Sequence, residues 1–191
     1  KQREKAHTPV AAIVGYTNAG KSTLLNRLTD AGILAEDKLF ATLDPTTRNL
    51  ELESGQQIML TDTVGFIRKL PHHLIEAFKS TLEEARYSDI ILHVVDCSNP
   101  NMDMQMHVVY ETLRELKVED KIIVTVFNKI DQKENGEFPR DLQSDYQMQI
   151  SAKTGAGVQE LLDTLEQILR SQKVYLERVF TYQEAGKIQT I

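Results

Sequence analysis

Cysteine is nearly absent from the sequence: Cys97 is the single one among 191 residues. One cysteine excludes an internal disulfide framework and a zinc site built from cysteines. The apolar runs are only a handful of residues long, too short to cross a bilayer, and no charged and then apolar leader opens the chain. With 22 Lys and Arg against 28 Asp and Glu, the net charge of −6 argues against coating nucleic acid or membranes by charge alone. We therefore expect a soluble, cytoplasmic protein of mixed secondary structure.

Apolar, β-branched runs alternate with helical patterns along the chain. Because the strand runs are apolar almost throughout, they are typical of a parallel sheet that is covered on both faces. Strands that alternate with helices predict βαβ units with right-handed crossovers. We predict a doubly wound α/β domain with a mostly parallel sheet, whose ligand binds at the carboxyl ends of the strands. The predicted strands are 10–14, 57–62, 89–96, 121–128 and 148–150, and the predicted helices are 21–29, 74–86, 102–116 and 158–169.

A phosphate-binding pattern follows the first predicted strand. Residues 15–22 fit G-x-x-x-x-G-K-S/T, with a strand before them and a helix after them. Glycines let successive backbone N–H groups curl around phosphate oxygens, and the helix N-terminus adds its positive dipole end. Lys21 supplies an ammonium group to the terminal phosphates, and the Ser22 hydroxyl is a hard oxygen ligand suited to Mg²⁺. This context favours a phosphate loop over a glycine turn that happens to precede a lysine.

A second pattern, D-x-x-G, ends the run at residues 57–62 and spans residues 62–65. The Asp62 carboxylate can hold Mg²⁺ through a water molecule, and the Gly65 N–H can approach a γ-phosphate. The pattern is weak alone, because Asp and Gly are common loop residues. It gains weight from its place after a strand and downstream of the phosphate loop.

Two patterns near the last strands predict a guanine pocket. Asn128-Lys129-Ile130-Asp131 follows the run at 121–128. An Asp carboxylate here can accept hydrogen bonds from guanine N1–H and the exocyclic amine, whereas adenine offers no matching donors. The Lys129 stem can lie over the base, and backbone N–H groups of residues 151–153 would complete the pocket. All four motifs in this order predict a P-loop GTPase that binds GTP and GDP.

The segment before the second predicted strand, residues 39–48, has the place of a nucleotide-dependent switch. A GTPase needs one hydroxyl from this segment to complete the Mg²⁺ shell when the γ-phosphate is present. Thr42, Thr46 and Thr47 are the chemical candidates, and the residues alone do not choose among them. The alternative is a connection ended by proline, whose threonines cap turns.

The strings at residues 15–22, 40–46 and 62–71 resemble the GTPase domain of the HflX family, in the Obg–HflX branch of translation-associated GTPases. The similarity covers residues 10–170, and it aligns Thr42 with the switch threonine that binds Mg²⁺. The resemblance implies binding to ribosomes, chiefly the large subunit, slow hydrolysis that the ribosome accelerates, and splitting or rescue of stalled ribosomes. It also implies that residues 1–9 are the remnant of a helical linker, 10–171 the GTPase domain and 172–191 the start of a C-terminal region.

The expected roles can be stated residue by residue. Phosphate, transition-state and switch roles are expected for Lys21, Thr42 and Gly65. Mg²⁺ is expected on Ser22, on Thr42 and, through water, on Asp62. The residues expected at the nucleotide are Gly15, Tyr16, Thr17, Asn18, Ala19, Gly20, Lys21, Ser22, Thr23, Phe40, Ala41, Thr42, Leu43, Asp44, Asp62, Thr63, Val64, Gly65, Asn128, Lys129, Ile130, Asp131, Ser151, Ala152 and Lys153.

The residue after the D-x-x-G glycine is Phe66, where Ras-like enzymes carry the glutamine that orients the attacking water. Phenylalanine cannot orient water, so we expect slow intrinsic turnover, with Phe66 packed or pointing to solvent in the resting state. Asn18 resembles the K⁺ ligand of potassium-activated GTPases, in which K⁺ supplies charge otherwise given by an arginine finger, and a loop-stabilising role weighs about equally. Arg48 and Arg68 are further candidates for such a finger, although contact with solvent or a partner is the stronger expectation.

Three functions are therefore compared. The first is a monomeric GTP-hydrolysing switch acting on the ribosome. The second is a potassium-activated GTPase in tRNA modification or subunit assembly. The third is a GTP-sensing binding module whose hydrolysis is incidental. The string at residues 40–46 favours the first over the second.

Overall fold

The computed structural model describes residues 8–29, 46–63, 65–66, 82–83, 85–133 and 139–172. Strands and helices alternate along most of this part of the chain, as the sequence patterns predict. The elements are β1 (Val10–Gly15), α1 (Lys21–Thr29), β2 (Thr46–Glu51), β3 (Gln57–Asp62), β4 (Ile90–Asp96), α3 (Met102–Glu115), β5 (Ile122–Asn128), the short 3₁₀ helix η2 (Ile130–Gln132), β6 (Tyr146–Gln149) and α4 (Val158–Ser171).

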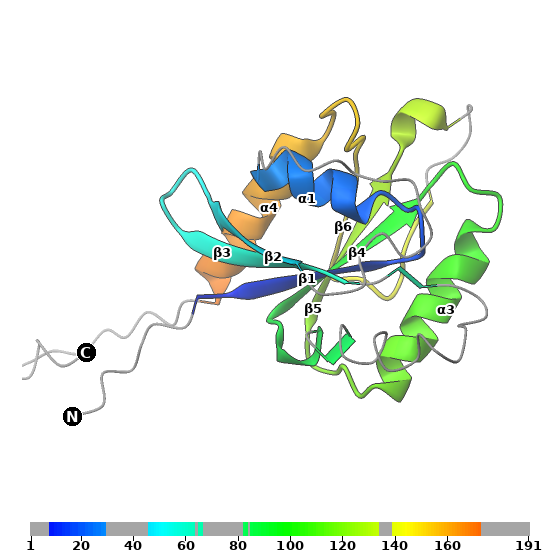
Figure 1. Cartoon of the computed structure of the whole chain (residues 1–191), viewed down its shortest axis with the longest axis horizontal. Coiled ribbons are helices and arrows are strands. Elements are labelled where there is room, and N and C mark those ends of the chain that lie inside the picture. The colour runs from blue at the N-terminus through cyan, green and yellow to red at the C-terminus, as the bar shows by residue number, and fades with distance from the viewer. Residues whose placement is uncertain are drawn as a thin grey trace, which may run out of the picture.

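The six strands form one sheet in the order β2-β3-β1-β4-β5-β6. Every neighbouring pair is parallel except β2 and β3, which are antiparallel. Helices lie on both faces of the sheet, with α1 and α4 on one and α3 on the other (Figure 1). The doubly wound, mostly parallel α/β fold predicted from the sequence is thus confirmed. The strand order reverses beside β1, because the chain places β3 on one side of it and β4 on the other. An open α/β sheet binds its ligand at such a point.

Side-chain alternation along β1 divides the core between the two faces of the sheet. Ile13 packs in the cluster that includes the apolar residues of α1 and α4. Ala12 and Val14 point to the opposite face, where they pack with Val109 and Leu113 of α3. The central strands β1 and β4 are buried along nearly their whole length, which explains why their sequences are apolar almost throughout.

One strand was not predicted from the sequence. Residues 46–51 form β2, although the prediction placed 46–48 in a connecting segment. The residues of β2 are polar apart from Leu50, a large apolar side chain that is buried. An edge strand pairs with a neighbour on one side only and needs to bury only one of its faces. It therefore lacks the continuous apolar run that marks the central strands. The alternative interpretation of residues 39–48, a connection ended by proline whose threonines cap turns, is therefore wrong for 46–48, and residues 39–45 lie outside the described residues.

The other boundaries agree closely with the predictions. The run at 89–96 corresponds to β4 and the run at 121–128 to β5, while β6 lies earlier than the predicted 148–150. Of the predicted helix at 74–86, the described residues 82–83 and 85–86 are helical, and residue 87 continues the helix. Within the part of the chain that the structure describes, no helix is long and apolar enough to cross a membrane.

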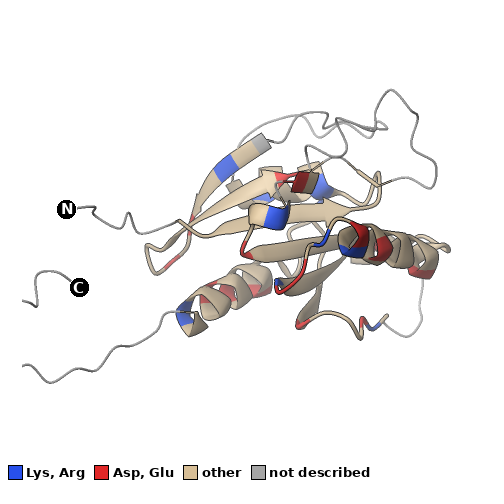
Figure 2. Cartoon of the chain, turned by 90° about the horizontal axis from the view of Figure 1, so that it is seen from below, with Lys and Arg blue, Asp and Glu red and all other residues tan. Residues whose placement is uncertain are grey.

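Acidic residues, red in Figure 2, are frequent along the helices α3 and α4. The exposed ones include Asp103, Glu111 and Glu115 on α3, and Glu160 and Asp163 on α4. The helices α3 and α4 cover opposite faces of the sheet, and their negative charge agrees with the net charge of −6. Neither helix surface therefore suits the phosphate backbone of a nucleic acid.

A buried polar cluster joins α3, β4, β5 and the segment before β6. Tyr110 and Thr125 each donate a hydrogen bond of 2.5 Å to Oδ2 of Asp141, which is itself buried. The ring of His93 meets the ring of Tyr110 edge-on, with centroids 5.1 Å apart. Burial lowers the pKa of His93 to about 4, and the charge of Asp141 opposes that shift only in part. His93 is therefore neutral in the folded protein near neutral pH.

This cluster predicts a loss of stability in mild acid. The unfolded chain takes up a proton at His93 near pH 6.5, whereas the folded chain does so only near pH 4. Stability from the neutral histidine is present above pH 6.5 and is lost as the pH falls towards 4, by about 3 kcal/mol. Urea unfolding at several pH values should show a shallower pH dependence for His93→Gln. The control is His107→Gln, which changes an exposed histidine of α3 and should keep the original slope. Equal slopes in all three proteins would contradict the prediction.

Candidate nucleotide-binding site

The loops with the predicted motifs all leave the carboxyl ends of parallel strands. These loops follow β1, β3, β5 and β6, and the pairing of the strands places their ends along one edge of the sheet. Figure 1 shows β1 running into the turn that leads to α1 at this edge. The four sequence motifs are therefore brought to one region of the molecule.

The phosphate loop, residues 15–22, has the strand–turn–helix context that its pattern predicts. β1 ends at Gly15 and α1 begins at Lys21. The chain turns sharply between them, with left-handed φ angles of 60° at Asn18 and 96° at Gly20. The carbonyl of Tyr16 lies inside the turn, where it accepts hydrogen bonds from the Ala19 N–H at 3.2 Å and from Lys21 Nζ at 3.3 Å.

A cation, a hydroxyl and a carboxylate meet where α1 begins. Lys21 and Asp62 are both buried, and the Ser22 hydroxyl donates a 2.9 Å hydrogen bond to Oδ2 of Asp62. Burial lowers the pKa of Lys21, and the negative charge of Asp62 opposes this effect. A phosphate group placed here would oppose it further. Two hard oxygen ligands side by side are also the kind of donor set that Mg²⁺ takes.

The loop after β3 is fastened to the phosphate loop through its backbone. The N–H of Phe66 donates to the Gly15 carbonyl at 3.0 Å, and the Phe66 carbonyl accepts from the Thr17 N–H at 2.8 Å. Gly65 lies so close that a Cβ atom on it would be 2.8 Å from Thr17 Cα and 3.1 Å from Lys21 Nζ. Thr63 bonds inward instead, with its N–H and its hydroxyl both donating to the Ile13 carbonyl. Gly65 is thus held beside the lysine expected to meet the terminal phosphates.

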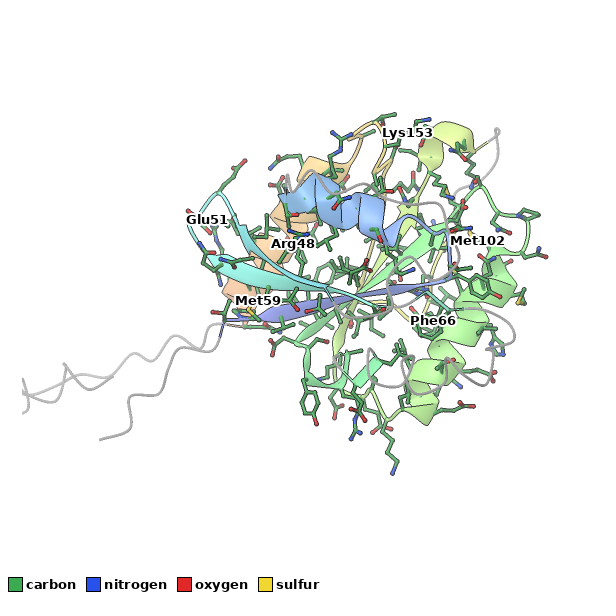
Figure 3. The ribbon with its side chains drawn as sticks, viewed as in Figure 1. Arg48, Glu51, Met59, Phe66, Met102 and Lys153 are labelled. Carbon is green, nitrogen blue, oxygen red and sulfur yellow. The ribbon has the colours of Figure 1, made fainter. Side chains whose placement is uncertain are left out.

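The side chain of Phe66 is 1% exposed. It packs on the α3 face of the sheet with Val14, Leu82 and Val109 (Figure 3). Of the two resting positions expected for this residue, packed or pointing to solvent, the packed one is present. A hydrocarbon ring held there offers no group that can orient water.

Asn128 joins two loops that are far apart in sequence. Its side-chain amide Nδ2 donates to the Ala19 carbonyl in the phosphate loop at 2.9 Å, and its Oδ1 accepts from the Ala152 N–H at 2.9 Å. The residue is buried, and its own carbonyl accepts from the Cys97 N–H. Asn128 therefore sets the distance between the phosphate loop and residues 151–153, the predicted base loop.

The next residues of this motif are shaped by a left-handed turn. Lys129 has a φ of 66°, and its Nζ forms a 2.7 Å ion pair with Oδ2 of Asp96 at the end of β4. Oδ1 of the same carboxylate accepts hydrogen bonds from the N–H and hydroxyl of Ser98. Asp131, in η2, is exposed to solvent, and Ile130 beside it is half-buried. The arrangement leaves the Asp131 carboxylate accessible to a ligand.

The predicted base loop, residues 151–153, follows β6. Ser151 and Ala152 are buried, whereas Lys153 is exposed at the end of the molecule that Figure 3 shows at the top. The Ser151 N–H donates to the Ala156 carbonyl, and its hydroxyl accepts from the Thr154 N–H. The loop is therefore closed on itself by local hydrogen bonds before any ligand is present.

Several predicted site residues lie outside the described residues. These are Phe40, Ala41, Thr42, Leu43, Asp44, Val64 and Arg68. Thr47, one of the other switch candidates, belongs to β2, where its hydroxyl lies 3.0 Å from that of Thr61. Arg48 is a half-buried residue of β2, and Thr23 is a partly buried residue of α1. Asn18 is exposed in the phosphate loop, and its role as a K⁺ ligand stays a prediction.

Two residues of the site were missed by the sequence reasoning. Asp96 pairs with Lys129, and Arg27 of α1 donates through Nε to the Ala152 carbonyl at 3.0 Å and through Nη2 to the Lys153 carbonyl. The acidic end of a strand was a visible signal for Asp96. Arg27 gave none, because its partners lie more than a hundred residues further along the chain.

Comparison with known proteins adds independent information. A family model described as "50S ribosome-binding GTPase" matches residues 10–129. The GTPase HflX of Lacrimispora saccharolytica is 78% identical over 191 residues, which is 100% of this chain and 45% of that protein. The GTPase HflX of Chlamydia pneumoniae is 49% identical over 189 residues, 98% of this chain and 40% of that protein.

Among solved structures, a GTP-binding protein from the archaeon Sulfolobus solfataricus in complex with GDP is similar, with a TM-score of 0.70 and 32% sequence identity. The match covers 86% of this chain and 53% of that one. The fold and the assembled motifs define the class of P-loop GTPase domains. The chain belongs to the HflX family of GTPases, and it spans less than half the length of the two curated relatives.

The packing around Gly20 predicts a severe effect of one methyl group. An alanine Cβ at this position would lie 2.2 Å from Nδ2 of Asn128, on a residue whose φ is 96°. Gly55 is the matched control, because its φ is also positive, at 79°, but no atom lies within 4 Å of its Cβ position. In urea unfolding, Gly55→Ala should cost about 1 kcal/mol from backbone strain alone. Gly20→Ala should cost about 3 kcal/mol, because it also displaces a buried amide from its partners. If the two variants lose similar amounts of unfolding free energy, the close packing of Gly20 against Asn128 does not stabilise the domain and the prediction is contradicted.

Proposed function

We propose that this chain binds GTP and GDP together with Mg²⁺ and hydrolyses GTP to GDP and phosphate as a molecular switch. The observation that carries the proposal is the position of Asn128, which connects the phosphate loop to the base loop by two 2.9 Å hydrogen bonds. A nucleotide has a phosphate end and a base end, whose separation is limited by the ribose that joins them. A protein suits such a ligand when it fixes the distance between a loop that binds phosphates and a loop that binds the base.

Selectivity for guanine is assigned to Asp131. Its carboxylate accepts two hydrogen bonds from guanine, and its exposed position leaves it open to the base. Lys129 contributes the aliphatic part of its side chain as a surface for the base ring, while its ammonium group stays on Asp96. Of the base loop's backbone donors, the Ser151 N–H is directed to the Ala156 carbonyl and the Ala152 N–H to Asn128 Oδ1, so the Lys153 N–H is the one assigned to the base.

Exchanging the carboxylate at position 131 tests guanine recognition. In Asp131→Asn one acceptor becomes a donor, so GTP affinity should fall by roughly a hundredfold or more, while XTP, which carries an oxygen in place of the exocyclic amine, should gain. Calorimetric titration of both nucleotides measures this. Asp103→Asn, an exposed substitution on α3, should leave both affinities unchanged. A variant at position 131 that keeps its preference for GTP would contradict the assignment.

At the phosphate end, Lys21 supplies positive charge to the β- and γ-phosphates from a buried position. Ser22 and Asp62 would hold Mg²⁺, Ser22 directly and Asp62 through water, with Thr42 as the third ligand. When bound, the ion supplies charge that stabilises the transferring phosphoryl group. Gly65, whose Cβ position lies 3.1 Å from Lys21 Nζ, is assigned the role of sensing the γ-phosphate through its N–H.

Slow intrinsic hydrolysis follows from Phe66. Its ring is buried with the apolar residues of α3 and cannot orient the attacking water. The positioning group therefore comes from a partner or from another segment of the chain. We propose the large ribosomal subunit as this partner, in the splitting or rescue of ribosomes in the cytoplasm, supported by the wording of the matching family model and by the family relationship.

Single-turnover hydrolysis tests this dependence on a partner. The isolated chain should hydrolyse GTP slowly, and purified large ribosomal subunits should raise the rate of a version extended to the length of its relatives. Co-sedimentation with subunits, with a GTP analogue and then with GDP, reports whether binding depends on the nucleotide. Fast hydrolysis by the isolated chain would contradict the role assigned to Phe66. Equal rates with and without subunits would contradict the ribosomal partner.

A further inference from the structure

Arg27 makes an unusual pair of contacts for a surface residue. It lies in the last turn of α1 and is exposed, yet its guanidinium group reaches two consecutive backbone carbonyls. Nε donates to the Ala152 carbonyl at 3.0 Å, and Nη2 donates to the Lys153 carbonyl. A planar guanidinium with donors in a fixed fork suits two neighbouring acceptors, so the contact restricts both peptide units.

Fixing these carbonyls also fixes the N–H groups on the same peptide units. A trans peptide is planar, so its C=O and N–H point in opposite directions. With the Ala152 carbonyl directed to Arg27, the Lys153 N–H points away from the end of α1. The Ala152 N–H is already directed to Oδ1 of Asn128. Arg27 and Asn128 therefore hold adjacent peptide units of the base loop from two sides.

The two contacts close a ring of elements around the proposed site. Asn128 connects the base loop to Ala19, in the phosphate loop. The phosphate loop continues into α1 at Lys21, and Arg27 on that helix returns to the base loop. A displacement of α1 would thus be transmitted to both ends of a bound nucleotide.

We propose that Arg27 is a positioning residue for guanine recognition, which orients the Lys153 N–H toward the O6 atom of the base. The proposal rests on the proposed function, since it assigns part of the base pocket to a residue that does not touch the nucleotide. A carbonyl oxygen at O6 is common to guanine and hypoxanthine, whereas adenine has an amine there. Arg27 therefore contributes to the preference for 6-oxopurines and leaves the recognition of the exocyclic amine by Asp131 unchanged.

Nucleotide titrations with Arg27→Gln test the proposal. The affinities for GDP and IDP should both fall by about tenfold, which corresponds to about 1.4 kcal/mol. Affinity for ADP should stay as it is, so the preference for GDP over ADP falls by the same factor. Affinity for pyrophosphate, which probes the phosphate loop alone, should not change. Release of a fluorescent GDP analogue should become about tenfold faster, because most such affinity losses appear in the dissociation rate.

Two further variants separate positioning from general stability. Arg170→Gln is the matched control, since Arg170 is an exposed arginine in the last turn of α4 and pairs with Glu166 of the same helix. It should bind every probe normally. Arg27→Lys keeps the charge but lacks the fork, so it should restore affinity only in part. The melting temperature of each variant should stay within about 2 °C of the unchanged chain, as expected for surface substitutions.

The outcomes distinguish this proposal from the one on which it rests. If the unchanged chain binds GDP tightly and Arg27→Gln releases it at the same rate, the role of Arg27 is contradicted and the proposed function stands. A parallel loss of pyrophosphate affinity also contradicts the role, because Arg27 would then act on the phosphate loop. If the unchanged chain does not bind GDP, the proposed function is contradicted and the role of Arg27 falls with it.

Discussion

The side-chain amide of Asn128 is the constraint on which the arrangement of the site depends. It is a buried group with a donor and an acceptor, and it uses the donor on the phosphate loop and the acceptor on the base loop. Removing either partner would leave a polar atom buried without compensation, a cost of about 1–3 kcal/mol. Gly20 lies so close to the same amide that a Cβ atom on it would be 2.2 Å from Nδ2. The two hydrogen bonds of Asn128 therefore set the separation of the two loops.

A second constraint links the phosphate loop to the loop after β3. Phe66 is fixed by its backbone to Gly15 and Thr17 and by its ring to the apolar residues beneath α3. The residue that lacks a catalytic group is thus an anchor. Its neighbour Gly65 thereby lies beside Lys21, while Asp62 is held beside Ser22 at the end of β3. Phe66 cannot orient the attacking water, but it attaches the loop after β3 firmly to the rest of the domain.

How much of the molecule could be predicted depends on the range of the interaction concerned. The central strands and the phosphate loop were predictable, because burial on both faces and the strand–turn–helix pattern leave local signals. β2 was not, since an edge strand with Leu50 as its large apolar residue resembles a polar connection. The contacts of Arg27 with the base loop and of Tyr110 with Asp141 were not predicted either. Each joins residues that are distant in the sequence, and no local spacing indicates them.

The large sequence separation between Arg27 and its partners also has a consequence for folding during synthesis. The phosphate loop is synthesised early, but the carbonyls that Arg27 holds come 125 and 126 residues later, after the last strand of the sheet. A chain still growing from its N-terminus would contain the phosphate loop and α1 without the base loop that completes the ring. The site therefore comes into existence only when β6 has joined the sheet. A ligand that recognises both ends would stabilise the finished domain by mass action and would offer little to the incomplete one.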